Sequence, residues 1–413
     1  MLVAHPNDRQ YGHLGLEMGM SLAHARKQGA DVCFIRPSTP LGSALFELES
    51  PQVRVLRPAI IVQELLRTLI SCRKVADRVG GWSAELLEQI ELAFVREVAP
   101  YVADPKMPPQ VRQRLRQARQ RLRASLQKAA RERRESEPYY KRRLIREPVP
   151  VRLPPAASED AARQARASGI DPGAPIVCIH AREPGYKRGS ELHDTKPDSR
   201  DDRTRNARIE SYVAAADHLV RAGFQVVCLG DPTMTPLQHP GVVDLATSPQ
   251  RTNLLEVWCL LRCAFIICGE SAFGSVIYLT NTPMLLVNAT EPFAAYPVRG
   301  PGLFVPKMVL DKRDGRRLTT LDLLTLDYHR QFRDTRRYVY ADNSPDEIRD
   351  AAQEMLEWVN GRWTESAAQR SYHAAAVAAA EKLWLRSAYV RKWGLHEGFL
   401  GDGRIAKVAL HTQ

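Results

Sequence analysis

Short apolar runs that alternate with helical patterns in the second half of the chain restrict the fold more than any other feature. Residues 176–180, 224–229 and 265–268 each have the length and composition of a buried strand. A stretch of helical period, 209–220, lies between the first two and ends at Gly223. This alternation predicts a doubly wound, parallel α/β sheet of the nucleotide-binding type. Further strands are expected at 242–243 and 284–287, and further helices at 254–261 and 271–279.

The first half of the chain carries a weaker form of the same pattern. Residues 2–4, 31–35 and 53–56 are expected to be strands, and the apolar pattern continues at 60–62. A helix is predicted over 12–27. Its apolar face would consist of Leu14, Met18 and Leu22. We therefore expect a second parallel sheet with crossover helices.

The length of 413 residues favours two domains. Four prolines between 148 and 155 indicate a linker. We expect an N-terminal domain at 1–150, a nucleotide-binding domain at 151–343, and C-terminal helices at 344–413, with packing back on the N-terminal domain as one option. Two signals indicate these last helices: Ser344, Pro345 and Glu347 form a capping box, and residues 365–386 are rich in alanine.

The stretch from 82 to 147 is predicted to be helical and is very basic. It contributes to a net charge of +12, which suits an anionic partner. Between 111 and 134 one apolar stripe is surrounded by arginines, which favours a solvated helix with one core-facing side. Contact with anionic lipid at a membrane surface and binding of nucleic acid are the alternatives. No aromatic residues interleave these arginines, which disfavours nucleic acid as a partner.

The cysteines and the absence of targeting segments indicate the compartment. The seven cysteines are odd in number and lack framework spacing, which favours reduced thiols in the cytoplasm. Cys259, Cys263 and Cys268 have no histidine close in sequence, so we expect core thiols and no metal site. We expect neither a signal peptide nor a transmembrane helix. The predicted location is the cytoplasm, with the inner face of the membrane as the alternative.

Two strand ends carry residues suited to a phosphate. His180-Ala181-Arg182 closes one strand, and an arginine there can grip a phosphate with two parallel hydrogen bonds. Gly269, Glu270 and Ser271 lie between another strand and a helix, where free backbone N–H groups favour an anion. The plainer interpretations are a satisfied histidine beside a solvated arginine, and a capped helix.

A long polar loop follows the first of these strand ends. It spans about 186–203 and contains Lys187, Glu191, Asp194 and Asp202, with Arg205 and Asn206 just beyond. Such a loop in a compact domain is either functional or disordered.

These motifs, taken in order, resemble a family of bacterial glycosyltransferases with the GT-B fold. The resemblance covers His180-Ala181-Arg182, Arg205-Asn206, Gly269 to Ser275 and Thr282 to Asn288, and extends to Pro306-Lys307, Asn343 to Ile348 and Gly12-His13-Leu14. It implies two Rossmann-like domains that face a central cleft, followed by C-terminal helices. It also implies a nucleotide-sugar donor.

The His-x-Arg tripeptide and the serine-bearing helix start are also similar to the fucosyltransferase superfamily. This similarity implies that Arg182 and Ser271 hold the nucleotide diphosphate without metal. It implies a carboxylate base soon after the arginine, with Glu191 at about the right spacing. Glu183-Pro184 stands where a second arginine and a threonine are common, which argues against a donor restricted to GDP-fucose.

The sequence thus predicts a metal-independent, inverting glycosyltransferase of the hexosyl or deoxyhexosyl type. It would act on a cell-surface glycan or lipid-linked acceptor, with the nucleotide-sugar as co-substrate and no other cofactor. The expected donor-binding residues are His180, Arg182, Lys187, Arg205, Asn206, Gly269, Glu270, Ser271 and Asn288. The expected catalytic candidates are Glu191, Asp194, Asp202 and His13. Two alternatives remain open: a nucleotide-sugar epimerase or hydrolase, and a nucleic-acid-binding or scaffold protein.

Overall fold

The computed structural model describes most of the chain outside the basic segment. The described residues are 2–4, 11–27, 29, 31–35, 43–50, 53–56, 150–184, 200–297, 299–384 and 400–411, with the single positions 109, 113, 117 and 120. Within them, no helix is both long enough and apolar enough to cross a membrane. The predicted strand at 60–62 and nearly all of the basic segment, 82–147, lie outside the described residues.

The N-terminal half forms a small parallel sheet. Strands β1 (Leu2–Ala4), β2 (Val32–Ile35) and β3 (Val53–Leu56) pair in that order, and all are parallel. Helix α1 (Tyr11–Lys27) connects β1 to β2, and the short η1 (Ser43–Glu47) precedes β3. The predicted apolar face of α1 is buried, with exposed fractions of 0% for Leu14, 2% for Met18 and 1% for Leu22. Each such side chain stabilises the fold by about 1.5–3 kcal/mol.

The second half forms a seven-stranded sheet in which every pairing is parallel. The chain is therefore an α/β protein with a doubly wound sheet, as the sequence predicts. The order across the sheet is β12 (Arg404–Ile405), β9 (Gly302–Pro306), β8 (Met284–Ala289), β7 (Phe265–Cys268), β4 (Ile176–His180), β5 (Gln225–Cys228) and β6 (Val242–Asp244).

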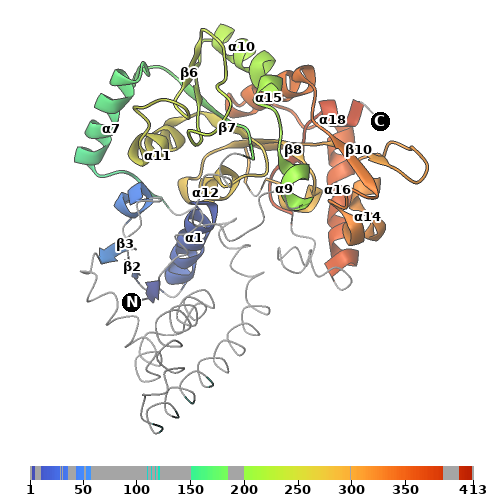
Figure 1. The fold of residues 1–413 in the computed structure, drawn as a ribbon, viewed down its shortest axis with the longest axis horizontal. Coiled ribbons are helices and arrows are strands. Elements are labelled where there is room, and N and C mark those ends of the chain that lie inside the picture. Colours follow the sequence, from blue (N-terminus) through green and yellow to red (C-terminus); the bar gives the residue numbers. More distant parts are fainter. Residues whose placement is uncertain are drawn as a thin grey trace.

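Helices cover both faces of this sheet (Figure 1). On one face, η3 (Ile209–Tyr212) leads into α10 (Val213–Arg221), which packs against α15 (Pro345–Val359). On the other face lie α11 (Asn253–Arg262) and α12 (Phe273–Thr280). Helix α1 packs against α12, and this contact joins the two halves of the molecule. Two further helices are α7 (Pro155–Ala167), which packs against α11, and α9 (Arg200–Arg205).

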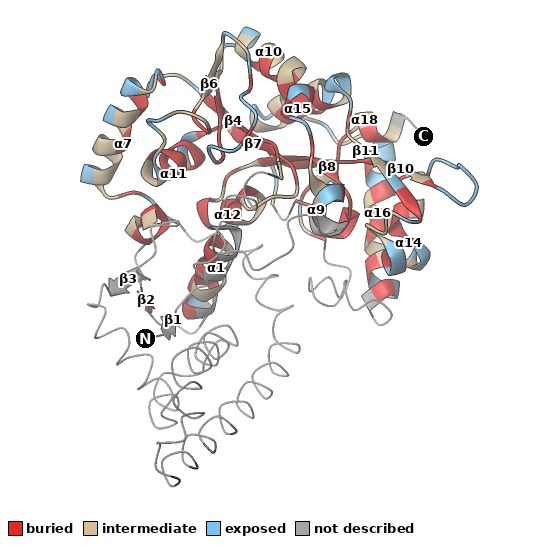
Figure 2. Ribbon diagram, in the orientation of Figure 1, coloured by how far each residue is buried: buried red, intermediate tan, exposed pale blue. Residues whose placement is uncertain are grey.

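The core of the large sheet is continuous, and the strands appear red along their length in Figure 2. Five cysteines are buried in it as free thiols: Cys178, Cys228, Cys259, Cys263 and Cys268. Burial raises the pKa of the Cys268 thiol to about 12. The prediction of core thiols is confirmed at these positions. The Cys33 side chain and Cys72 lie outside the described residues.

The C-terminal segment completes the large sheet. Ser344 caps α15 in the predicted capping box, where its side chain accepts from the Glu347 backbone and the Glu347 side chain accepts from the Ser344 backbone. Helix α16 (Ala367–Trp384) follows, and it packs against β12. The short α18 (Val408–His411) ends the described chain beside α15 and β9.

A lobe that the sequence did not predict lies between β9 and α15. We call residues 308–342 the clamp lobe. It contains the antiparallel strands β10 (Met308–Asp311) and β11 (Tyr338–Ala341), with η4 (Asp322–Leu324) and α14 (Leu326–Gln331) between them. Its own small core is Val309, Leu318, Leu323, Tyr328 and Tyr338. The short α13 (Pro292–Ala295) precedes β9.

Two sequence-based boundaries are wrong. Pro155 is the first residue of α7 rather than part of a linker, because proline is well suited to the first helical turn. Helix α12 begins at Phe273, two residues later than predicted, and its N-cap residue is Ala272. Ser271 therefore precedes the helix instead of opening it. The domain boundary at residue 150 stays a prediction.

Candidate functional site

The connections of the large sheet change direction between β4 and β7. From β4 the chain passes through α10 to β5 on one side, whereas from β7 it passes through α12 to β8 on the other. In open α/β sheets, ligands bind at such a switch point, outside the carboxyl ends of the strands. His180 and Cys268 are register partners at these two ends, and the Gly269 N–H donates to the His180 carbonyl at 3.4 Å. Arg182 and Ser271 therefore leave neighbouring strand ends.

His180 fixes the end of β4. It is 8% exposed, its Nδ1 donates to the Leu229 carbonyl at 2.9 Å, and its ring lies 4.6 Å from that of Phe273. Burial is the main cause that lowers the pKa of His180 to about 4, and the nearby Arg182 acts in the same direction. The imidazole is therefore neutral at physiological pH, and its proton is on Nδ1.

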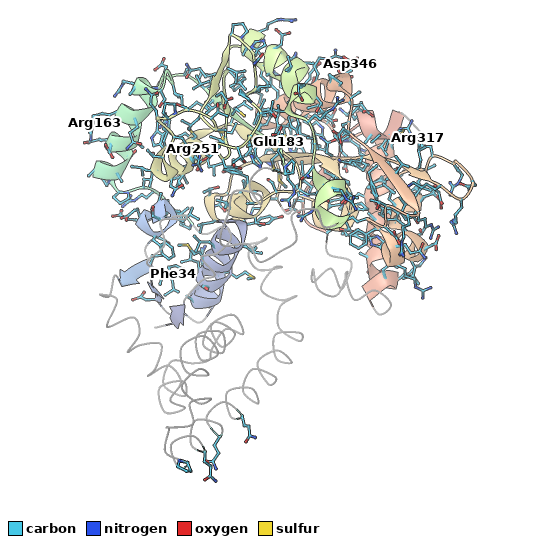
Figure 3. All side chains as sticks on the ribbon, viewed as in Figure 1. Phe34, Arg163, Glu183, Arg251, Arg317 and Asp346 are labelled. Atoms are coloured by element: carbon cyan, nitrogen blue, oxygen red, sulfur yellow. The ribbon has the colours of Figure 1, made fainter. Side chains whose placement is uncertain are left out.

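Arg182 lies where the loop after β4 begins. Its Nε atom is buried, and its carbonyl accepts from the Ala207 N–H at 3.0 Å, which brings the end of α9 to the same place. The next residue, Glu183, accepts from the backbone N–H and the hydroxyl of Thr235 at 2.7 and 3.1 Å. Figure 3 labels Glu183 near the middle of the molecule, beside these strand ends. Arg182 thus stands in a loop that is fixed on both sides.

Ser271 carries an unsatisfied polar atom. Its Oγ is buried and has no hydrogen-bond partner among the described residues. It does not cap α12, because that helix has no side-chain cap. A buried hydroxyl without a partner costs about 1–3 kcal/mol, and such groups often mark functional positions. The plainer interpretation, a serine that caps the helix, is therefore excluded.

Glu270 is fully engaged within the protein. Its Oε1 accepts from the Thr290 and Glu291 N–H groups at 3.0 and 3.2 Å, and its Oε2 accepts from the Thr290 hydroxyl at 2.7 Å. Arg333 pairs with the same Oε2 at 2.7 Å. Burial alone would raise the pKa of Glu270, but Arg333, Thr290 and Arg205 together lower it. Glu270 is an ionised anchor for the loop that carries Ser271.

Arg205 and Asn206 lie at the end of α9. Arg205 is close enough to Glu270 to lower its pKa. The Asn206 Oδ1 atom is buried and has no hydrogen-bond partner among the described residues. The Asn206 carbonyl accepts from the Lys307 ammonium at 2.6 Å. Asn206, like Ser271, thus presents a buried polar atom that the described protein does not satisfy.

Asn288, a predicted donor-binding residue, is fully buried and holds the fold together. Its backbone N–H donates to the Asn343 side chain, and its Oδ1 accepts from the Asn343 N–H, both at 2.7 Å. Its Nδ2 donates to the Tyr212 hydroxyl at 3.4 Å. Asn288 has a φ of 57°, which asparagine tolerates better than most residues. Because its side chain joins β8 to the start of α15, we assign it to the fold rather than to a ligand.

The catalytic candidates are only partly placed. Lys187, Glu191 and Asp194 lie outside the described residues. Asp202 is in α9 and His13 is in α1, but their side chains are outside the described set. The backbone near His13 lies close to α12: a Cβ atom added to Gly15 would be 2.9 Å from the Val276 Cα atom.

A separate cavity of about 140 Å³ lies beyond the end of β9, bordered by Lys307, Arg317 and Glu347. Lys307 is paired with Asp342, and Glu347 is part of the capping box. The cavity is two strands away from β7, on the side away from β4. This cavity is therefore separate from the switch point between β4 and β7. Two of its charged side chains, Lys307 and Glu347, already make contacts within the protein. In the described ranges, no group of three or more His, Cys, Asp or Glu side chains could hold a metal ion.

No protein-family model and no curated protein matches the chain. Among solved structures, ADP-heptose LPS heptosyltransferase II of E. coli is similar at 14% identity and a TM-score of 0.41, over 87% of this chain and 99% of that one. A family 9 glycosyl transferase from Veillonella parvula DSM 2008 is similar at 11% identity and 0.39, over 74% and 85%. E. coli heptosyltransferase WaaC with ADP is similar at 11% identity and 0.33, over 74% and 91%. None of these three is a fucosyltransferase, so the similarity to that superfamily rests on sequence motifs alone.

Proposed function

We propose that this protein is a GT-B glycosyltransferase that binds the diphosphate of a nucleotide-sugar at the switch point between β4 and β7. One observation carries the proposal: the Ser271 hydroxyl is buried, with no hydrogen-bond partner among the described residues, at the strand end next to the one that Arg182 follows. A phosphate oxygen at this position would accept from the hydroxyl and pair with the guanidinium. The first N–H groups of α12 lie on the same side.

The leaving group of the proposed transfer carries negative charge that has to be stabilised. When the acceptor oxygen attacks the anomeric carbon, the bond to the donor phosphate breaks and the nucleoside diphosphate leaves with the electron pair. Its charge has to be neutralised by a metal or by protein donors. We propose Arg182, Arg205, Lys187 and the start of α12 as these donors, which would make the transfer metal-independent.

A base has to take the proton of the acceptor hydroxyl as the new bond forms. We propose Glu191, with Asp194, Asp202 and His13 as alternatives. The contact of α1 with α12 favours a role for His13, because it brings the starts of two helices from different sheets together. A direct attack of this kind inverts the anomeric centre.

The acceptor we propose is a cell-surface glycan or a lipid-linked precursor. The basic segment at 111–134 would hold the enzyme at the anionic inner face of the membrane, where such precursors are found. Vesicle sedimentation with and without anionic lipid tests this part. Loss of binding at about 0.5 M salt is the expected result, because exposed charges are screened at that ionic strength.

A thermal-shift panel of ADP, GDP, UDP, CDP and dTDP, with and without EDTA, tests the proposed donor site. We expect one of them to raise the melting temperature in EDTA, since binding to the folded state alone stabilises it. Arg182→Ala should abolish the shift. Arg163→Ala is a matched control, because Arg163 is exposed on α7 and its one ion-pair partner within the described ranges is Asp160. Absence of a shift with all five nucleotides would count decisively against this function.

A further inference from the structure

The clamp lobe contacts both loops of the proposed donor site. One contact reaches the loop after β7, which carries Glu270 and Ser271, through Arg333. The other reaches the segment before η3, which carries Asn206, through Asp342. The lobe leaves the large sheet after β9 and returns before α15, so it reaches these loops from outside the sheet (Figure 1).

The Arg333 contact is a buried ion pair with additional hydrogen bonds. The side chains of Arg333 and Glu270 are 15% and 9% exposed, and their closest atoms are 2.7 Å apart. The Arg333 Nε also donates to the Thr290 hydroxyl at 2.7 Å, and this hydroxyl in turn donates to Glu270. A carboxylate held in this way cannot rotate, and it is adjacent in sequence to Ser271.

The backbone of Arg333 is unusual for an arginine. Its φ is 61°, a left-handed conformation that favours glycine or asparagine. Its N–H donates to the Tyr340 hydroxyl at 2.6 Å, which holds it there. Residues kept in such conformations cluster at functional sites. An arginine at this position indicates that its side chain is needed.

The Asp342 contact is made together with Lys307. The Lys307 ammonium donates to Asp342 Oδ1 at 2.7 Å and to the Asn206 carbonyl at 2.6 Å, and the side chain is 2% exposed. Asp342 Oδ2 accepts from the Arg208 N–H at 3.2 Å. The backbone on both sides of Ala207 is thus fixed, and Ala207 is the residue that binds the Arg182 carbonyl.

We propose that the clamp lobe sets the geometry of the donor site, with Arg333 and Asp342 as positioning residues that act on the loops of Ser271 and Asn206, respectively. This inference rests on the function proposed above. Neither residue needs to touch the ligand. Arg333 holds the Glu270 side chain, next to Ser271, and Asp342 holds the Arg208 N–H, two residues after Asn206. Small displacements of atoms that bind a ligand have large effects on affinity and rate.

Hydrogen exchange in the free, full-length protein tests the positioning without any ligand. Arg333→Gly suits the observed φ and removes the side chain, and Asp342→Asn removes one charge. We expect Arg333→Gly to accelerate amide exchange in residues 268–274 and Asp342→Asn to accelerate it in residues 204–209, each by about tenfold or more and each without affecting the other segment. Wild-type exchange in both variants would overturn the proposal.

Nucleotide affinity separates positioning from a merely structural role. The Kd of whichever of ADP, GDP, UDP, CDP or dTDP the wild type binds is measured well below the melting temperature of each variant. We expect about a tenfold increase in Kd in Arg333→Gly and Asp342→Asn, with partial recovery in Arg333→Lys. The controls Arg336→Gln and Asp350→Asn should bind as the wild type does, because among the residues that the structure describes Arg336 pairs with Asp334 alone and Asp350 with Arg349 alone.

The outcomes distinguish the two proposals. If the wild type binds none of these nucleotides, the proposed function fails, and the exchange data alone decide whether the lobe holds the loops. If the wild type binds and both variants bind equally well, the function stands and the role of the clamp lobe is overturned.

Discussion

Gly15 in α1 lies directly against the backbone of Val276 in α12. A Cβ atom on Gly15 would be 2.9 Å from the Val276 Cα atom, closer than real contacts of that kind. Helix α1 follows a strand of the small sheet and α12 follows a strand of the large sheet. This glycine therefore sets how closely the two halves of the molecule approach each other. Because each helix follows a strand of its own sheet, the crossing also brings the starts of both helices together.

Gly15→Ala should therefore destabilise the protein. Alanine is the better helix former by about 0.5–1 kcal/mol, but overpacking a tight contact costs about 1–3 kcal/mol. We expect a net loss of about 1 kcal/mol in the free energy of unfolding, measured by urea denaturation. Gly274→Ala in α12 is the matched control, because its Cβ would meet only the Gly269 carbonyl at 4.0 Å. If Gly15→Ala were more stable than the wild type, the two helices would be able to move apart enough to accommodate the added methyl group.

Asn343→Ala should affect stability more than nucleotide binding. The Asn343 side chain accepts from the Asn288 N–H and donates to the Pro306 carbonyl, both in the buried interior. Leaving those partners unsatisfied costs about 1–3 kcal/mol each, so we expect a loss of several kcal/mol in chemical denaturation. The Kd for a bound nucleotide, measured at low temperature, should be unchanged. A large rise in that Kd would instead assign Asn288 a role in nucleotide binding.

The sequence predicted five of the seven strands of the large sheet, and four of these, β4, β5, β7 and β8, are mostly apolar runs of four to six residues. It did not predict β9 and β12. It did locate the two strand ends that carry Arg182 and Ser271, since parallel strands place their carboxyl ends on one edge. The neighbouring positions of β4 and β7 follow from a strand order that no local pattern reveals.

Other features depend on partners that are distant in sequence. Asn288 looks like a ligand contact because it is polar and near a strand end, yet its partner Asn343 is 55 residues away. The clamp lobe has few apolar runs and is held partly by ion pairs such as that of Asp311 with Arg337. Arg333, near its end, pairs with Glu270 across 63 residues. None of these pairings can be inferred from periodicity.

His180 should make stability depend on pH in the acid range. Burial lowers its pKa in the folded protein to about 4, whereas the unfolded chain titrates near 6.5. As the pH falls through 6.5, the unfolded state takes up a proton that the folded state does not, and stability is lost at about 1.4 kcal/mol per pH unit until about pH 4. Above pH 7 this contribution is constant.

A comparison with His180→Gln isolates this effect. Burial raises the pKa of Glu256 to about 7, so that residue acts in the opposite direction in both proteins. Urea denaturation at pH 5.5 and 7 should show a change in the free energy of unfolding between the two pH values that differs between the wild type and the variant by about 1 kcal/mol. Equal pH dependence in the two proteins would mean that folding does not lower the pKa of His180.

Ser271→Ala should separate stability from function. The Ser271 hydroxyl is buried and has no partner in the part of the chain that the structure describes, so its removal should leave the free energy of unfolding unchanged or raise it by about 1 kcal/mol. If that hydroxyl donates to a phosphate oxygen, the Kd of the bound nucleoside diphosphate should rise about tenfold, equivalent to about 1.4 kcal/mol. The same substitution at Ser344 provides the control. Ser344 caps α15, so Ser344→Ala should lose about 0.5–2 kcal/mol of stability and keep its affinity. A Ser271 variant that loses stability in the same way, and binds nucleotide as the wild type does, would assign that hydroxyl to the fold and remove Ser271 from the proposed donor site.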